Sequence, residues 1–296
     1  MSRKLLPYLS LAIGILALSI TAMFVRWAGA PGPITAFYRL AFSTLILAPF
    51  FARRGPQQAA AGRAHLIFPI LGGIFTSLDF SFWNTSTLYT TASNATLLGN
   101  TAPLWVALFA WLALREKLKG KFWVGLALAL SGAVLVMGRD FLTHSRLGIG
   151  DLLAICAGVF YAGYLLSTQH GRRYFPNLTQ IWLMGASATV SLLFINLLLR
   201  NPFWGYPPQT WLIFLLTAVV SQIIGYQAIS YALGHLPASV VAPTMIGQPV
   251  MTTILAIPLL HEIPQPVQLL GGIAVLAGVY LVHQSHSQNR VEELEP

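Results

Sequence analysis

The chain has 296 residues, of which 56% are hydrophobic and only 8% are Asp, Glu, Lys or Arg. Ordinary soluble domains carry roughly 25% charged residues, so this composition indicates an all-α integral membrane protein. The apolar excess excludes intrinsic disorder, and the single cysteine, Cys156, excludes a disulfide scaffold. The net charge of +9 lies in short basic clusters between apolar runs, which is typical of membrane topology and does not predict nucleic-acid binding.

Ten apolar runs approach the length of a membrane-crossing helix, which needs about 20 residues. The first run follows Arg3 and Lys4, but it is too long for a cleavable signal sequence, so we expect it to be the first span. Short connections leave no room for a soluble domain. The predicted spans are residues 5–27, 33–51, 65–86, 91–114, 119–138, 148–169, 178–199, 209–233, 237–260 and 265–284.

The basic residues predict that both termini lie in the cytoplasm. In this orientation twelve Lys and Arg face inward and four face outward, which is the positive-inside bias of multi-pass proteins. We expect a multi-pass protein of the cell membrane, in a bacterium the inner membrane. The inward group is Arg3, Lys4, Arg53, Arg54, Arg63, Arg115, Lys117, Lys119, Lys121, Arg172, Arg173 and Arg290. The outward group is Arg26, Arg139, Arg146 and Arg200.

The sequence repeats itself at an offset of 146 residues. Over residues 87–136 the offset gives eleven identities without a gap, where composition alone would give roughly four. Pro103 aligns with Pro249, and Glu116 aligns with Glu262. The chain is therefore predicted to consist of two five-helix halves.

We place the first half at residues 1–142, the second at 143–284, and a polar tail at 285–296. An odd number of helices per half inverts the second half in the membrane. The loops agree, because residues 115–121 hold four basic side chains and the repeated loop 261–266 holds no Lys or Arg. Ten helices in two inverted repeats is a recurrent architecture of secondary transporters.

The repeated segments resemble the EamA repeat of the drug/metabolite transporter superfamily. In the first half the resemblance lies in Leu88 to Ser93, Pro103, Arg115 to Leu118, Gly125 and Gly132. In the second half it lies in Leu233 to Ser239, Pro249, His261, Glu262, Gly271 and Gly278. Phe37 to Leu40 resembles the family's Arg-containing second helix. The sequence departs from the family pattern at Gly185, which is the repeat partner of Arg39, and at His261 and Pro264. The resemblance implies an exporter without naming its cargo.

Two charged side chains lie well inside predicted spans, Arg39 in the second and Asp79 in the third. At 1.5 Å per residue both lie roughly 10 Å below the outer end of their helix, so they can meet. A buried charge in a membrane is costly and is a candidate functional residue. We expect an ion pair that binds a charged cargo group or takes part in proton coupling, with a purely structural bridge as the alternative.

Polar and aromatic residues of other spans complete the predicted site, with helix packing as the alternative for each. Trp83 lies one turn from Asp79, and Thr35 and Ser43 lie one turn on either side of Arg39. The further candidates for substrate binding or coupling are Asn100, Tyr161, Tyr164, Gln222, Tyr226 and Gln248. The candidates for hinge or gate positions are Pro103, Glu116, Pro249 and Glu262.

These features predict a secondary transporter that exports small organic metabolites, amino-acid-like or amphipathic, by alternating access. A lipid-linked or multidrug flippase and, more remotely, an intramembrane enzyme are the alternatives. The sequence contains no catalytic dyad, metal motif or nucleotide-binding loop, so we expect no cofactor and no enzyme activity. The expected partners are a small-molecule substrate, the lipid bilayer and, if transport is coupled, protons, with no nucleic acid or obligate protein partner.

Overall fold

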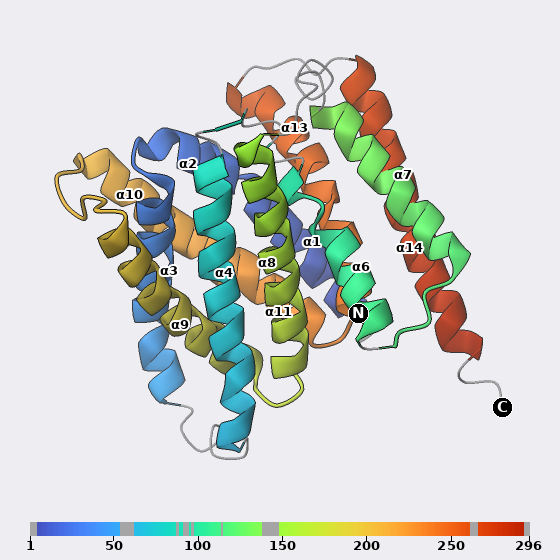
Figure 1. Cartoon of the computed structure of the whole chain (residues 1–296), viewed down its shortest axis with the longest axis horizontal. Helices are drawn as coiled ribbons and strands as arrows, with labels where there is room; N and C mark the ends of the chain where they lie inside the picture. The colour runs from blue at the N-terminus through green and yellow to red at the C-terminus, as the bar shows by residue number, and fades with distance from the viewer. Residues whose placement is uncertain are drawn as a thin grey trace. The chain divides into compact units, whose positions relative to one another are not determined.

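The computed structural model describes residues 5–53, 62–86, 89–90, 95, 98–113, 115–137, 148–260 and 266–292, where every regular element is helical (Figure 1). Three shorter apolar helices fall in the first, fourth and fifth predicted spans. The all-helical membrane class is thus confirmed, while the count of ten crossings and their orientation stay predictions. Seven described segments are long and apolar enough to cross a membrane: Gly32–Ala52, Arg63–Ser86, Ile149–Gly171, Asn177–Leu198, Pro208–Leu233, Ala238–Leu255 and Pro266–His286.

The chain forms two compact units that cut across the two halves of the sequence. The first unit contains Met1–Asn84 and Gly163–Leu236, and the second contains Thr85–Ala162 and Pro237–Pro296. Each unit therefore takes helices from both predicted halves. The division into residues 1–142, 143–284 and 285–296 remains a prediction about the repeat.

The first unit is built around three helix contacts: α3 against α9, α1 against α11, and α1 against η3. The predicted first span is interrupted at Ile20, and the predicted eighth span contains a π-helical stretch, η3. Its elements are α1 (Leu6–Ser19), α2 (Thr21–Ala28), α3 (Gly32–Ala52), η2 (Arg63–Leu66), α4 (Ile67–Ser86), the end of α8 (Ile149–Gly171), α9 (Asn177–Leu198), α10 (Pro208–Leu216), η3 (Thr217–Tyr226) and α11 (Gln227–Leu233).

These sequences form helices because a chain in lipid must satisfy every backbone N–H and C=O internally. Apolar residues occur on the outer faces as well as in the core, as the exposed Leu45 and Phe194 show. Such side chains face the bilayer. Inside the unit, Gly73 of α4 lets the helix approach α9, because a Cβ there would lie 2.5 Å from the carbonyl oxygen of Met184.

The second unit contains two helices that are interrupted at equivalent points of the repeat. Its elements are α6 (Ala102–Leu112), α7 (Gly120–Met137), the start of α8, α12 (Ala238–Met245), α13 (Gly247–Leu260) and α14 (Pro266–Glu292). A turn at Asn100 precedes α6, and Ile246, its partner at the 146-residue offset, separates α12 from α13. Pro103 and Pro249 lie in the first turn after each interruption, where proline is tolerated.

The last helix differs from expectation, since α14 continues to Glu292 and so includes most of the predicted polar tail. Ser285, the first residue of that predicted tail, is buried.

Glycines hold α7 and α14 in close antiparallel contact, and the two helices lie side by side in Figure 1. A Cβ on Gly125 would lie 2.8 Å from the carbonyl oxygen of Gly278, and one on Gly132 would lie 2.6 Å from that of Gly271. The repeat partner of Gly125 is Gly271, and that of Gly132 is Gly278. The repeat therefore exchanges the two contacts, as a two-fold axis does.

We expect Gly132→Ala to lower the free energy of unfolding by about 1–3 kcal/mol, because the new methyl group would overlap backbone atoms of α14 that cannot move aside. Gly120→Ala on the same helix is the matched control, since a Cβ there meets nothing within 4 Å. Thermal unfolding of the two purified variants measures the difference. Equal melting temperatures would contradict the close contact.

Candidate functional site

Arg39 is the buried charge at the centre of the candidate site. Its neighbours on the polar stripe of α3 are satisfied locally, because the hydroxyl of Thr35 donates to the carbonyl of Pro31 and that of Ser43 to the carbonyl of Leu40. Arg39 is only 6% exposed and turns its side chain toward other helices of the first unit. Thr35 and Ser43 therefore bond to backbone carbonyls of α3 and of the residue before it, whereas Arg39 bonds to another helix.

The Arg39 guanidinium lies between two aromatic rings. Its Cζ atom is 5.1 Å from the centroid of the Phe80 ring and 4.9 Å from that of Tyr226, within the range of cation–π attraction. Its Nε–H donates to Oε1 of Gln222 at 3.1 Å. The Tyr226 ring also packs against Tyr164, with centroids 5.4 Å apart. α3, α4, α8 and η3 therefore converge on one cation.

Asp79 adds a carboxylate to this group. It precedes Phe80 on α4, and its charge interacts with that of Arg39 and with the two tyrosines, Tyr164 and Tyr226. We call Arg39, Asp79, Phe80, Tyr164, Gln222 and Tyr226 the Arg39 site. The structure brings the two charges near each other, and a direct ion pair between them stays a prediction.

The π-helix η3 positions Gln222 and Tyr226. Its i to i+5 hydrogen bonding is rare and is frequently found at functional sites. Gly14 of α1 and Gly225 of η3 bring the two backbones together, because a Cβ on Gly14 would lie 3.2 Å from the Gly225 carbonyl oxygen. Gly225 is also the repeat partner of Asp79, so close helix packing explains why the second half carries no acid there.

The same reasoning applies to Gly185, the repeat partner of Arg39. A Cβ on Gly185 would lie 2.7 Å from Oγ1 of Thr44, so this position serves the contact between α9 and α3. The charged groups of the Arg39 site and Phe80 consequently come from the first half of the sequence, and the two tyrosines and the Gln222 amide come from the second half.

The side-chain amide of Gln222 uses its oxygen in a hydrogen bond but not its N–H groups. Its side chain is fully buried, its Oε1 accepts from Arg39, and its Nε2 has no hydrogen-bond partner among the residues that the structure describes. A buried amide N–H without a partner costs about 1–3 kcal/mol. Arg39 and Gln222 together can therefore donate hydrogen bonds to a carboxylate or another anionic oxygen of a ligand.

The structure distributes the remaining candidates over both units. Trp83 is half-buried one turn beyond Asp79, and its place in the site stays a prediction. Asn100, Tyr161 and Gln248 are half-buried in the second unit, so their predicted part in the Arg39 site also stays a prediction. Glu262 lies outside the described residues. No group of His, Cys, Asp and Glu that could hold a metal occurs in the described part of the chain.

Glu116 joins the loop before α7 to the start of α12. The hydroxyl of Ser239 donates to Oε2 of Glu116 at 2.6 Å, next to the N-terminal turn of α12, where a negative charge is favourable. A hinge or gate role for Glu116, Pro103 and Pro249 is compatible with this connection and stays a prediction.

Sequence reasoning missed Phe80. A phenylalanine in an apolar span is normally a packing or lipid-facing residue, so its type carries no functional signal. The available clue was position, since Phe80 directly follows the only acid predicted deep in a span.

An all-helical membrane protein with charged residues buried between its helices has the construction of a transporter. The EamA-like transporter family model matches residues 5–138 and 148–284, and the chain belongs to this family of the drug/metabolite transporter superfamily. It is therefore a multi-pass transporter of the cell membrane.

Relatives agree with this class. An uncharacterized transporter of Archaeoglobus fulgidus is 29% identical over 86% of this chain and 88% of its own. A probable terminal-alkyne amino-acid exporter of Streptantibioticus cattleyicolor is 24% identical over 72% of this chain and 71% of its own. A protein of known crystal structure matches 98% of this chain and 99% of its own with a TM-score of 0.78 at 17% identity, which shows the fold.

Proposed function

We propose that this transporter exports small organic compounds that carry a carboxylate and an apolar part, such as amino acids and related amphipathic metabolites. The observation that carries the proposal is the Arg39 guanidinium, held between two aromatic rings and beside the unpartnered amide N–H group of Gln222. The name of one relative, an amino-acid exporter, supports the same class of cargo and the direction of transport.

The Arg39 site suits a zwitterion. Arg39 and Gln222 supply donors for a carboxylate, and Asp79 supplies an acceptor for an ammonium group. Phe80, Tyr164 and Tyr226 offer aromatic surface to an apolar side chain. Because opposite charges of the ligand face opposite charges of the protein, a neutral or singly charged analogue should bind less well.

The proposed mechanism is alternating access between two inverted five-helix halves, with both termini in the cytoplasm. The exchanged glycine contacts of α7 and α14 support the inverted repeat, as do the equivalent interruptions before α6 and α13. Interrupted helices at corresponding positions of two repeats are typical of transporters that use this mechanism. Proton coupling through Asp79 completes the proposal.

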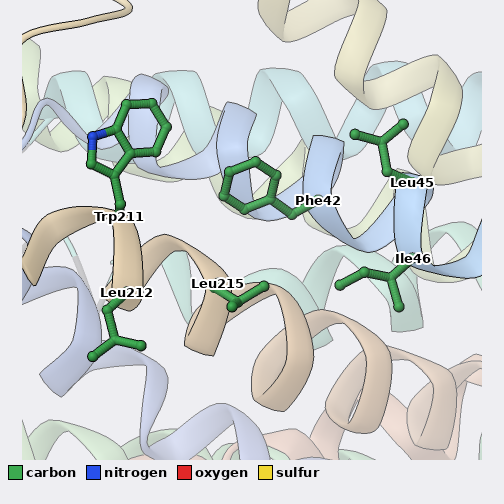
Figure 2. Close-up of a pocket in the computed structure, with 6 residues that line it drawn as sticks. All are labelled: Phe42, Leu45, Ile46, Trp211, Leu212 and Leu215. Atoms are coloured by element: carbon green, nitrogen blue, oxygen red, sulfur yellow. The ribbon is translucent and has the colours of Figure 1, made fainter. Parts of the chain in front are cut away.

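A lipid flippase is the alternative, and a groove between α3 and α10 bears on it. Figure 2 shows the groove, which has a volume of about 400 Å³. A flippase must move a polar headgroup, and this groove offers no polar side chain to accompany one. The groove therefore favours contact with lipid tails and leaves the polar Arg39 site for a metabolite. Its lining residues are Phe42, Leu45, Ile46, Trp211, Leu212 and Leu215.

A transport screen in proteoliposomes tests the proposal. Vesicles that contain the purified protein are loaded with radiolabelled amino acids and related carboxylates, and release is followed under an imposed pH gradient. We expect faster release than from protein-free vesicles for zwitterionic amphipathic compounds, and no acceleration for their esters, which lack the carboxylate. Acceleration of a labelled phospholipid across the bilayer, with no metabolite released, would favour the flippase instead.

A further inference from the structure

A second group of buried polar side chains lies at the end of the first unit where α8 ends and α9 begins. We define the polar seam as Arg172, Asn177, Gln180, Gln227 and Ser230, contributed by the α8–α9 loop, α9 and α11. Asn177 Nδ2 donates to the backbone carbonyl of Gln227 at 2.9 Å and to its side-chain Oε1 at 3.0 Å. Arg172 Nε donates to the carbonyl of Ser230 at 3.2 Å. These contacts close the seam.

Four side-chain atoms in the closed seam are left without partners among the described residues. They are buried and make no hydrogen bond: Asn177 Oδ1, Gln180 Oε1, Gln180 Nε2 and Ser230 Oγ. Gln180 and Ser230 are fully buried as residues. Water would satisfy all four atoms, so opening the seam recovers part of the free energy that closing it costs.

Gly171 of α8 packs directly against the Gln180 side chain of α9. A Cβ at this position would overlap the side-chain amide of Gln180, so the amide rests against the backbone of α8. A small separation of α8 from α9 would therefore uncover the Gln180 amide.

One face of α8 connects the seam to the Arg39 site. Tyr164, Thr168 and Arg172 follow at four-residue steps, so they lie on the same side of the helix and its C-terminal end. Tyr164 belongs to the Arg39 site, and Arg172 belongs to the seam. Thr168 between them is fully buried, and its hydroxyl donates to the sulfur of Met184 on α9 at 3.7 Å.

We propose that the polar seam is the closed end of the permeation path, and that α8, α9 and α11 separate there to admit water and cargo to the Arg39 site. The proposal rests on export by alternating access. The proposed topology puts the 172–176 loop in the cytoplasm, so the seam is the entrance for cargo. The Gln180 amide, which donates and accepts, lines the opened path behind Asn177.

Cysteine accessibility tests the opening, because the chain has one cysteine to remove. In a Cys156→Ala background, Ser230→Cys is a nearly isosteric probe inside the seam. Ala188→Cys is the matched control, since Ala188 is equally buried and packs among apolar residues of the same unit. Inside-out and right-side-out vesicles are treated with a membrane-impermeant methanethiosulfonate, and modification is measured by mass.

We expect the thiol of the Ser230→Cys variant to react from the cytoplasmic side at least tenfold faster than that of Ala188→Cys, and to stay unmodified from the outer side. Reaction from the outer side only, no reaction in a Ser230→Cys variant that keeps the wild-type melting temperature, or equal reaction of both variants would each overturn the proposal. The readout needs no identified cargo. A failed transport screen would therefore leave it intact, and a failed labelling result would leave the Arg39 site intact.

The Gln180→Leu variant distinguishes a role of Gln180 in the path from a purely structural role, because stability and transport are measured separately. Leucine removes two unpartnered polar atoms at similar volume, so we expect the melting temperature to stay equal or to rise. We expect transport to fall at least tenfold, since the path loses its polar lining. A parallel loss of stability and transport would indicate a structural residue, and unchanged transport would exclude Gln180 from the path.

Discussion

Arg39→Gln should reduce transport about 10- to 100-fold, the largest loss of cargo binding that we expect from any single substitution. A charge-assisted hydrogen bond contributes about 1.5–3 kcal/mol, and glutamine removes both this bond to the cargo carboxylate and the attraction to the flanking rings. The loss should appear mainly as weaker cargo binding, measured as a raised KM in proteoliposomes. Arg173→Gln is the control, because Arg173 is exposed outside the site.

Arg39→Lys separates charge from geometry. Lysine keeps the positive charge but lacks the planar fork that bonds Gln222 and stacks between Phe80 and Tyr226. We expect it to recover only part of the transport that Arg39→Gln loses. Wild-type rates in Arg39→Gln, at equal protein abundance, would remove Arg39 from the substrate site.

Asp79→Asn should abolish transport that is driven by a pH gradient. Asp79 is the acid predicted deep within a span, and its carboxylate can exchange a proton as cargo or the neighbouring Arg39 charge approaches. Counterflow of labelled against unlabelled cargo without a gradient should persist in this variant if coupling alone is lost. Undiminished gradient-driven transport by Asp79→Asn would exclude this residue as the carrier of the coupled proton.

Combining the two substitutions in a double-mutant cycle tests the predicted ion pair. Removing one charge leaves the other uncompensated in a low dielectric, which costs about 3–5 kcal/mol, whereas removing both restores neutrality. We expect abundance to fall in each single neutral variant and to recover in the double variant, while transport stays lost. Recovery of transport as well would indicate a structural bridge, and additive losses of abundance would show that the residues do not pair.

Charge was the part of the site that the sequence could reveal. Arg39 and Asp79 stand out because an ionised side chain is rare and costly in an apolar run. Gln222, Tyr226 and Tyr164 were candidates by type, but their grouping around Arg39 depends on how α3, α8 and η3 pack. Phe80 and Gln180 were missed, because residue type does not reveal surroundings. A phenylalanine ring beside a cation has the same sequence signal as one that faces lipid, and a buried glutamine amide has the same signal as an exposed one.

The repeat and the membrane class follow from the sequence by itself. Long apolar runs can hide their backbone polar groups only as helices in a bilayer, and an offset of 146 residues preserves prolines and glycines in both halves. The interruption at Ile20 and the π-helix of η3 are invisible in uniformly apolar sequence. Tertiary structure alone decided which glycines meet, as Gly125 does with Gly278. Close approach depends on the backbone of a partner helix, and residue order along one chain does not specify that partner.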